Sequence, residues 1–96
     1  MSRGMLTTGA RIRQVRERLG LSQPEFGQLV GAHWVTVSRW ERDEVTPPPY
    51  QQGLVEKFGE AAGRGNQDLG EAVKAAIVTV GVIAAVFMLL QAAFKK

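Results

Sequence analysis

The chain contains no cysteine and a single histidine among its 96 residues. Without cysteine, disulfide bonds, thiolate metal sites and thiol nucleophiles are excluded, and one imidazole argues against a histidine-rich metal site. The sequence also lacks a phosphate-binding loop of the Walker type and a Ser/His/Asp set with a recognisable arrangement. It therefore predicts a protein that is not an enzyme and that holds no metal or other cofactor.

A strong excess of charge of either sign is lacking as well. Twelve lysine and arginine residues stand against nine acidic residues, which gives a net charge of +3. This mild excess permits an anionic partner without demonstrating one. Hydrophobic residues make up 45% of the chain and charged residues 22%, a composition that excludes general disorder. The length suits one small domain with an appendage.

One long uncharged run is present, residues 75–94, with the sequence AAIVTVGVIAAVFMLLQAAF. A helix of this length is about 30 Å long, which matches the hydrocarbon core of a bilayer. The run is apolar on every side, so it has no amphipathic face to lay on a water-soluble core. Lys74 precedes it, and Lys95 and Lys96 follow it. The run predicts a transmembrane helix; the alternative is a helix buried in an oligomer, which needs several chains.

Helical signals dominate the first 58 residues. Ser22 followed by Glu25 predicts a capping box at the start of one helix, and Gly31 is expected to end it. Prolines 47–49 prevent the next helix from continuing. Together with the spacing of apolar residues, these signals predict four short helices, at about residues 9–19, 23–30, 34–42 and 50–58.

Both tryptophans fall in the third of these helices, six residues apart, which is about 120° of net rotation. Val37 and Trp40 define an inward arc, and Trp34 lies at the edge of the outward arc. Trp40 is therefore expected in the core and Trp34 at the surface. Two short helices joined by a turn centred on Gly31, the second of them polar on one side, are typical of a helix-turn-helix.

The segment SQPEFGQLVGAHWVTVSRWERD, residues 22–43, resembles the helix-turn-helix of the Cro/C1-type (XRE-type) family of phage repressors and small bacterial regulators. The resemblance extends over about residues 10–58. It rests on residues that fall at the family's spacing without a gap: Gln23, Phe26, Gly27, Gly31, Thr36, Val37, Ser38, Trp40 and Glu41.

The resemblance implies that the outward side of the third helix lies in the major groove of double-stranded DNA. It places Gln23 at a phosphate-clamping position, and it pairs Arg16 with Glu41 as a structural tie between the first and third helices. His33 and Arg42 are further candidates for contact with phosphate. The implied base-contact positions are Trp34, Val35, Ser38 and Arg39.

Side-chain chemistry supports part of this assignment. Arg39 can donate a bidentate pair of hydrogen bonds to guanine, the commonest specific contact. The indole of Trp34 is a poor reader of base edges and suits a protein partner equally well. Asp43 and Glu44 depart from the family pattern, because acidic side chains beside a duplex repel phosphate.

Beyond residue 58 the composition changes, and residues 59–70 read GEAAGRGNQDLG. A glycine-rich segment with few apolar residues behaves as a flexible coil. Asp68 followed by Glu71 is a second capping signal, so the final helix is expected to begin near Leu69. The sequence thus predicts an all-α protein: a small four-helix helix-turn-helix DNA-binding domain (1–58), a flexible linker (59–68), and a single C-terminal transmembrane helix with a short lysine tail (69–96).

These patterns predict a membrane-anchored, sequence-specific DNA-binding protein, a transcriptional regulator of phage or bacterial type. It is expected as a single-pass protein of the inner (cytoplasmic) membrane, with the N-terminal domain in the cytoplasm. A homodimer is expected, because such domains usually bind two half-sites. Gly81 and Ala85 form a small-xxx-small pair that can pack two membrane helices. Two alternatives stay open: a membrane-anchored, protein-binding adaptor similar to bacterial cytoskeletal anchors, and a phage assembly or coat-related membrane subunit.

Overall fold

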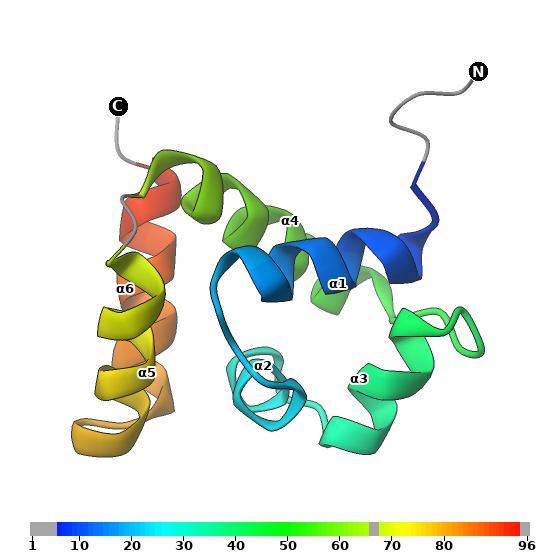
Figure 1. Cartoon of the computed structure of the whole chain (residues 1–96), viewed down its shortest axis with the longest axis horizontal. Coiled ribbons are helices and arrows are strands. Elements are labelled where there is room, and N and C mark those ends of the chain that lie inside the picture. Colours follow the sequence, from blue (N-terminus) through cyan, green and yellow to red (C-terminus); the bar gives the residue numbers. More distant parts are fainter. Residues whose placement is uncertain (1–5, 66–67, 95–96) are drawn as a thin grey trace.

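The computed structural model describes residues 6–65 and 68–94, which form six α-helices (Figure 1). Residues 1–5 of the expected first domain, residues 66 and 67 of the expected linker, and the expected tail Lys95 and Lys96 lie outside the described residues. The helices are α1 (Thr8–Arg18), α2 (Gln23–Val30), α3 (Trp34–Glu41), α4 (Pro49–Arg64), α5 (Leu69–Thr79) and α6 (Val82–Phe94).

Side-chain caps determine where the first helices begin. Thr7 Oγ1 accepts the backbone N–H of Ala10 at 3.0 Å at the start of α1. The predicted capping box of α2 is confirmed: Ser22 Oγ accepts the Glu25 N–H at 3.2 Å, and Glu25 Oε1 accepts the Ser22 N–H at 2.8 Å. Gly31, with φ 74°, ends α2 as expected. The limits of α1, α2 and α3 lie within one residue of the predicted ones.

The core begins where α1, α2, α3 and α4 meet. The rings of Phe26 and Phe58 contact edge to face, with their centroids 6.3 Å apart. Trp40 is 2% exposed and Val37 is fully buried, which confirms the predicted inward arc of α3. Each fully buried side chain of this size contributes about 1.5–3 kcal/mol relative to an exposed one.

Helix α4 is longer than the sequence predicts. Residues 59–64, expected in a flexible linker, continue the helix to Arg64. Burial gives the reason, because Ala61 is fully buried like Phe58 one turn earlier, so apolar contacts continue past the expected end. Packing here outweighs the low helix propensity of glycine. The boundary of the first domain otherwise stays a prediction.

The predicted transmembrane helix is wrong. The segment forms two antiparallel helices, α5 and α6, that pack as a hairpin (Figure 1). With 11 and 13 residues, each helix is about 15–20 Å long, shorter than the ~30 Å hydrocarbon core of a bilayer. Among the described residues, no helix combines the length and the hydropathy needed to cross a membrane. This finding overturns the expected single-pass location in the inner membrane and gives no support for a lipid bilayer as partner.

Gly81 makes the hairpin possible. Its φ of 133° lies in a region that residues with a side chain rarely adopt. Its N–H donates to the carbonyl of Ala76 at 2.8 Å and closes α5, while its own carbonyl accepts the Ala85 N–H at 3.3 Å. Ala85 is fully buried in the core. The two residues expected to pack membrane helices are therefore a turn residue and a core residue of the hairpin.

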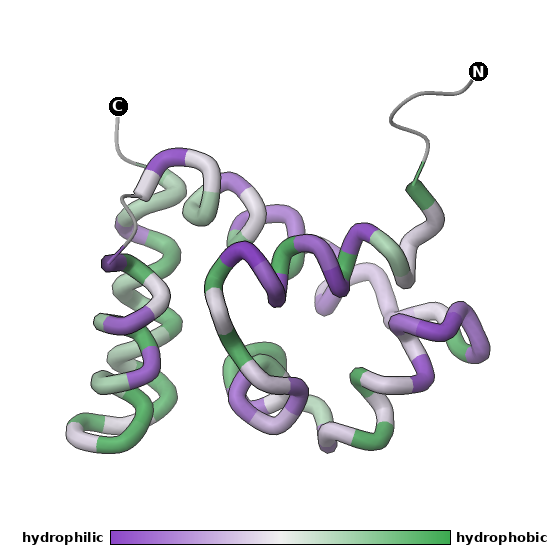
Figure 2. Tube along the Cα trace, in the orientation of Figure 1, coloured by the Kyte–Doolittle hydropathy of each residue, from purple (hydrophilic) through white to green (hydrophobic). Residues whose placement is uncertain are grey.

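The hairpin is docked on the rest of the protein through α6. Leu89 is fully buried and belongs to the same core cluster as the residues of α1 to α4. At the end of α6, Lys57 Nζ lies 4.6 Å from the centroid of the Phe94 ring. The Arg64 guanidinium donates to the carbonyl of Ala93, where a cation complements the helix dipole. Figure 2 shows hydrophobic residues along both helices of the hairpin.

Helix α5 approaches the end of α1 closely at Gly70. A Cβ placed on Gly70 lies 2.0 Å from the carbonyl oxygen of Leu19, which is backbone and cannot rotate away. Gly70→Ala is therefore expected to lower the free energy of unfolding by about 1–2 kcal/mol, because overpacking forces the hairpin to shift. Urea unfolding followed by circular dichroism measures the change.

Gly63→Ala is the matched control, since it introduces the same methyl group into α4. A Cβ at Gly63 meets nothing within 4 Å, so this variant should gain up to about 1 kcal/mol from helix propensity. A Gly70→Ala variant as stable as the wild type would contradict the close packing of α5 on α1.

Candidate nucleic-acid interface

The turn between α2 and α3 is held by the backbone and by a buried amide. The Ala32 N–H donates to the carbonyl of Gly27 at 2.9 Å. From α4, the buried Gln51 donates through Nε2 to the carbonyl of Val30 at 2.8 Å. This bond satisfies a carbonyl that the end of α2 leaves without an intrahelical partner, and so helps to fix the direction of α3. No signal in the sequence pattern singles out Gln51.

His33 is the N-cap of α3. Its Nδ1 accepts the backbone N–H of Val35 at 3.2 Å, which satisfies one of the first N–H groups of the helix. The imidazole lies beside the indole of Trp34, with ring centroids 5.9 Å apart and an interplanar angle of 32°. His33 is exposed at this end of α3, and its contact with phosphate stays a prediction.

Helix α3 has one side in the core and one side outward. Val37, Trp40 and Glu41 are buried. On the opposite side, Trp34 is 48% exposed, and Arg39 is also exposed. The spacing i, i+1, i+4, i+5, i+8 brings the predicted contact residues of this helix to one side. This surface, called the α3 face below, consists of Trp34, Val35, Ser38, Arg39 and Arg42.

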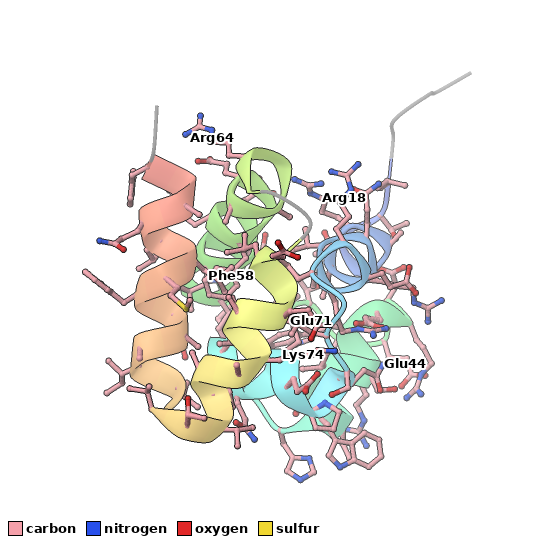
Figure 3. All side chains as sticks on the ribbon, turned by 60° about the vertical axis from the view of Figure 1, so that its left-hand side comes forward. Arg18, Glu44, Phe58, Arg64, Glu71 and Lys74 are labelled. Carbon is pink, nitrogen blue, oxygen red and sulfur yellow. The ribbon has the colours of Figure 1, made fainter. Side chains whose placement is uncertain are left out.

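Arg42, at the end of the α3 face, is engaged within the protein by Ser38 and by Glu44, which Figure 3 labels. Its Nη1 donates to Ser38 Oγ at 2.8 Å, and its Nε donates to Glu44 Oε2 at 2.9 Å. The hydrogen bond from Arg42 holds the pKa of the Glu44 carboxyl below its ordinary value. Both side chains of the pair are about half exposed, 51% and 52%. Glu44 therefore occupies the guanidinium of a residue that the sequence predicts as a phosphate contact.

Glu44→Gln is expected to raise the affinity for double-stranded DNA by about 3- to 10-fold at low salt. The substitution removes a negative charge beside the duplex and weakens the hold on Arg42. The slope of log affinity against log salt should steepen by up to about 1 if Arg42 gains a phosphate contact. Fluorescence anisotropy titrations at several salt concentrations measure both quantities.

Glu60→Gln is the control for the change in net charge. Glu60 is paired with Lys57 on α4 at 3.5 Å and is 42% exposed, so its surroundings are similar but lie outside the α3 face. An equal gain in affinity for both variants would show that only the net charge matters, and would refute a local role for Glu44.

A buried carboxylate ties α3 to α1. The side chain of Glu41 has no exposed area, and Arg16 holds it through two hydrogen bonds, Nε to Oε2 at 2.6 Å and Nη2 to Oε1 at 2.9 Å. Gln23 Nε2 donates to Oε1 at 3.1 Å, and Arg13 Nε lies 3.4 Å from the same oxygen. The structure thus brings together the pair that the family resemblance implies and adds two side chains to it.

Opposing effects act on the pKa of Glu41. Burial raises the pKa of this carboxyl, but the hydrogen bonds from Arg16, Gln23 and Arg13 outweigh burial and hold the pKa below its ordinary value. The hydrogen bond with Glu41 in turn raises the pKa of Arg16. The pair stays ionised at neutral pH. Because the Gln23 amide faces this carboxylate, a phosphate contact by Gln23 stays a prediction.

Asp43 has a structural role that the sequence does not predict. It follows α3 with φ 60°, a left-handed conformation in which aspartate is less strained than most residues. Its Oδ1 accepts the N–H of Gly9 at 2.9 Å in the first turn of α1. A carboxylate at a helix N-terminus complements the helix dipole. The signal for this role is the position itself, an aspartate where the family often has glycine after the third helix.

Comparison with known proteins identifies the family. A profile of the helix-turn-helix domain matches residues 8–72, which include α1 to α4 and the first turn of α5. No curated protein and no solved structure matches the chain significantly. The matched residues make up more than half of the 96. The chain therefore belongs to the helix-turn-helix domain family, and this domain indicates a DNA-binding role.

Proposed function

We propose that this protein is a sequence-specific DNA-binding regulator of transcription that reads the major groove with the α3 face. One observation carries the proposal: the core anchors one side of α3 and leaves Arg39 exposed on the other. The guanidinium of Arg39 can donate to O6 and N7 of guanine. Val35 offers an apolar contact for a thymine methyl group, and Ser38 offers a hydroxyl for either base type.

Contacts with phosphate position such a domain on the duplex but do not read sequence. Gln23 is the first residue of α2, where the positive end of the helix dipole attracts phosphate. His33 and Arg42 flank α3 at its two ends. These three residues are the proposed phosphate contacts, and they bracket the proposed base contacts.

The resemblance of residues 22–43 favours the Cro/C1 type within the helix-turn-helix proteins. The proposed partner is double-stranded DNA with two half-sites, bound by a homodimer, because domains of this type usually bind in that way. The proposed regulatory role is the control of transcription at such a site.

A mobility shift of the full chain tests the proposal, with random and genomic DNA fragments at two salt concentrations. We expect a shift on a subset of genomic fragments that weakens as salt rises, because phosphate contacts release counterions. No shift even at the lower salt concentration would overturn the proposal.

Trp34 favours one alternative, a domain that binds protein. Its indole is 48% exposed, presents a single N–H donor that matches base edges poorly, and belongs to a residue type enriched at protein interfaces. Under this alternative the full chain gives no shift with DNA, so the same experiment separates the two functions.

A further inference from the structure

Helix α6 has a second apolar side that the core of the protein leaves uncovered. Ile83 is 86% exposed, Phe87 61% and Phe94 63%. Their spacing of i, i+4 and i+11 places them on one side of the helix. The buried residues Ala85 and Leu89 lie on the opposite side. The helix is therefore apolar on both sides, although only one of them packs within the chain.

The turn of the hairpin extends this uncovered surface. Val78 is 84% exposed and Val80 74%. No residue between positions 75 and 94 carries a charge; a charge reaches these exposed side chains from α4, where Lys57 lies against the Phe94 ring. The resulting surface, called the hairpin patch below, consists of Val78, Val80, Ile83, Phe87 and Phe94.

The size of the hairpin patch fits a protein interface. Side chains of these types, exposed to this extent, leave on the order of 100 Å² each, or roughly 500–600 Å² together. A stable protein interface buries about 800 Å² on each partner, including a polar rim. This area lies at the upper end of the roughly 300–600 Å² that the largest apolar patch of a typical monomer covers, and such patches are often functional. The hairpin patch is therefore large enough to form the apolar centre of a dimer interface.

We propose that the hairpin patch is the contact surface between two copies of this chain. In a two-fold dimer both copies contribute the same surface, so a charge close to the symmetry axis would face a like charge. The five residues of the hairpin patch carry no charge, and the cation that contacts the patch, Lys57, lies at its Phe94 end. The inference deepens the homodimer of the proposed function, but it concerns the protein without DNA.

The charges around the hairpin patch select an antiparallel arrangement of the two α6 helices. Lys57 and Arg64 lie at the Phe94 end of α6 (Figure 3 for Arg64). Parallel helices would bring these cations of both copies together. Antiparallel helices place them at opposite ends of the interface and bring the Ile83 end of one copy to the Phe94 end of the other.

The same residues fit a bilayer surface less well. Helices that lie in a membrane interface carry lysine and arginine on the polar side, whereas α6 contains no basic residue between Val82 and Phe94. On the neighbouring helix α5, Glu71 is paired with Lys74 at 3.7 Å, so this pair offers no net positive charge to anionic lipids. Helix α3 and α6 lie at opposite ends of the molecule (Figure 1), so a dimer through α6 leaves the α3 face accessible.

Sedimentation equilibrium of the full chain without DNA tests the proposal over a series of concentrations. The wild type is expected to dimerise. The double variant Ile83→Lys/Phe87→Lys should raise the dissociation constant of the dimer by at least about 100-fold, because the apolar centre of the interface then has to bury four added positive charges. Circular dichroism should stay unchanged, since both side chains are exposed, and the unfolding midpoint should stay unchanged at concentrations at which the wild type is also monomeric.

Tyr50→Lys is the matched control, because Tyr50 is a large apolar side chain with 65% exposure on α4. It should dimerise like the wild type. A wild type that is monomeric at every concentration would overturn the proposal, as would equal dissociation of the control and the double variant. A further outcome would assign the hairpin patch to a bilayer instead. In that case the wild type is monomeric and binds phosphatidylcholine/phosphatidylglycerol vesicles, and the double variant does not bind them. Because no DNA is present, loss of the dimer and loss of DNA binding are observed separately.

Discussion

Replacing Glu41 by alanine is expected to lower the free energy of unfolding by about 3 kcal/mol, the low end of what breaking a buried ion pair costs. The carboxylate is fully buried and accepts hydrogen bonds from Arg16 and Gln23. Its removal leaves the Arg16 guanidinium against an apolar site without a counter-charge. We expect the low end of this cost because the Arg16 side chain is 15% exposed, so water can hydrate its guanidinium once the carboxylate is removed. Urea unfolding measures the loss.

Two further variants show whether the Arg16–Glu41 ion pair itself is responsible for the loss of stability. Glu56→Ala makes the same change at an exposed position of α4 and should shift stability by no more than about 0.5 kcal/mol. Arg16→Met/Glu41→Leu removes both charges and should recover part of the loss. Equal effects of Glu41→Ala and Glu56→Ala would contradict the structural role of the buried carboxylate.

Lowering the pH should reveal the contribution of Glu41 to the stability of the wild type. Because the folded pKa of Glu41 is depressed, its contribution is fully present above the unfolded value of about 4.3 and is lost as the pH falls through the folded pKa. The difference in stability between the wild type and Glu41→Gln should therefore be largest at neutral pH and shrink below about pH 4. A difference that stays constant with pH would mean that Glu41 has no depressed pKa.

Arg39→Ala is expected to weaken binding to the preferred DNA fragment by about 10- to 100-fold, the value of one bidentate contact with guanine. Binding to random DNA should fall much less, because phosphate contacts supply most of that affinity. Arg39 is exposed, so the stability should change by no more than about 0.5 kcal/mol. Competition mobility shifts measure the ratio of specific to random affinity.

Arg18→Ala and Arg39→Lys serve as controls for this result. Arg18 is also exposed but lies on α1, away from Glu44 at the end of α3 (Figure 3). Arg39→Lys keeps the charge but lacks the planar fork that matches guanine, so it should bind random DNA normally and discriminate poorly. If Arg18→Ala and Arg39→Ala weaken both kinds of binding equally, Arg39 acts only as a charge.

Local signals explain why the helix-turn-helix part could be predicted from sequence. The capping box at Ser22, the end of α2 at Gly31 and the inward position of Trp40 depend on residues within one or two turns. Each is therefore visible in a short stretch of sequence.

The C-terminal hairpin could not be predicted in the same way. An uncharged run of twenty residues has the same hydropathy whether it forms one helix or two. The difference lies in the backbone at Gly81 and in the fit of Ala85 and Leu89 into the core. The turn at Gly81 is a local backbone conformation, and the burial of Ala85 and Leu89 depends on contacts with distant parts of the chain; hydrophobic periodicity indicates neither.

Helical spacing was sufficient to predict which side of α3 carries the candidate site. It did not predict the hydrogen bonds that these residues form. The bonds of Gln23 with Glu41 and of Asp43 with Gly9 depend on distances between elements, and the bond of Arg42 with Glu44 depends on how the chain turns after α3. Helix spacing alone cannot supply such distances. Whether the α3 face contacts DNA stays a prediction.

Helix α3 separates the residues that hold the fold from those that meet a partner. Trp40 and Glu41 attach it to the core and to α1, whereas Trp34 and Arg39 contribute little to stability. A change at an outward position therefore alters recognition while the domain keeps its shape. After gene duplication, one copy of this chain could acquire a different target by a few surface substitutions. Every intermediate variant on that path would still fold.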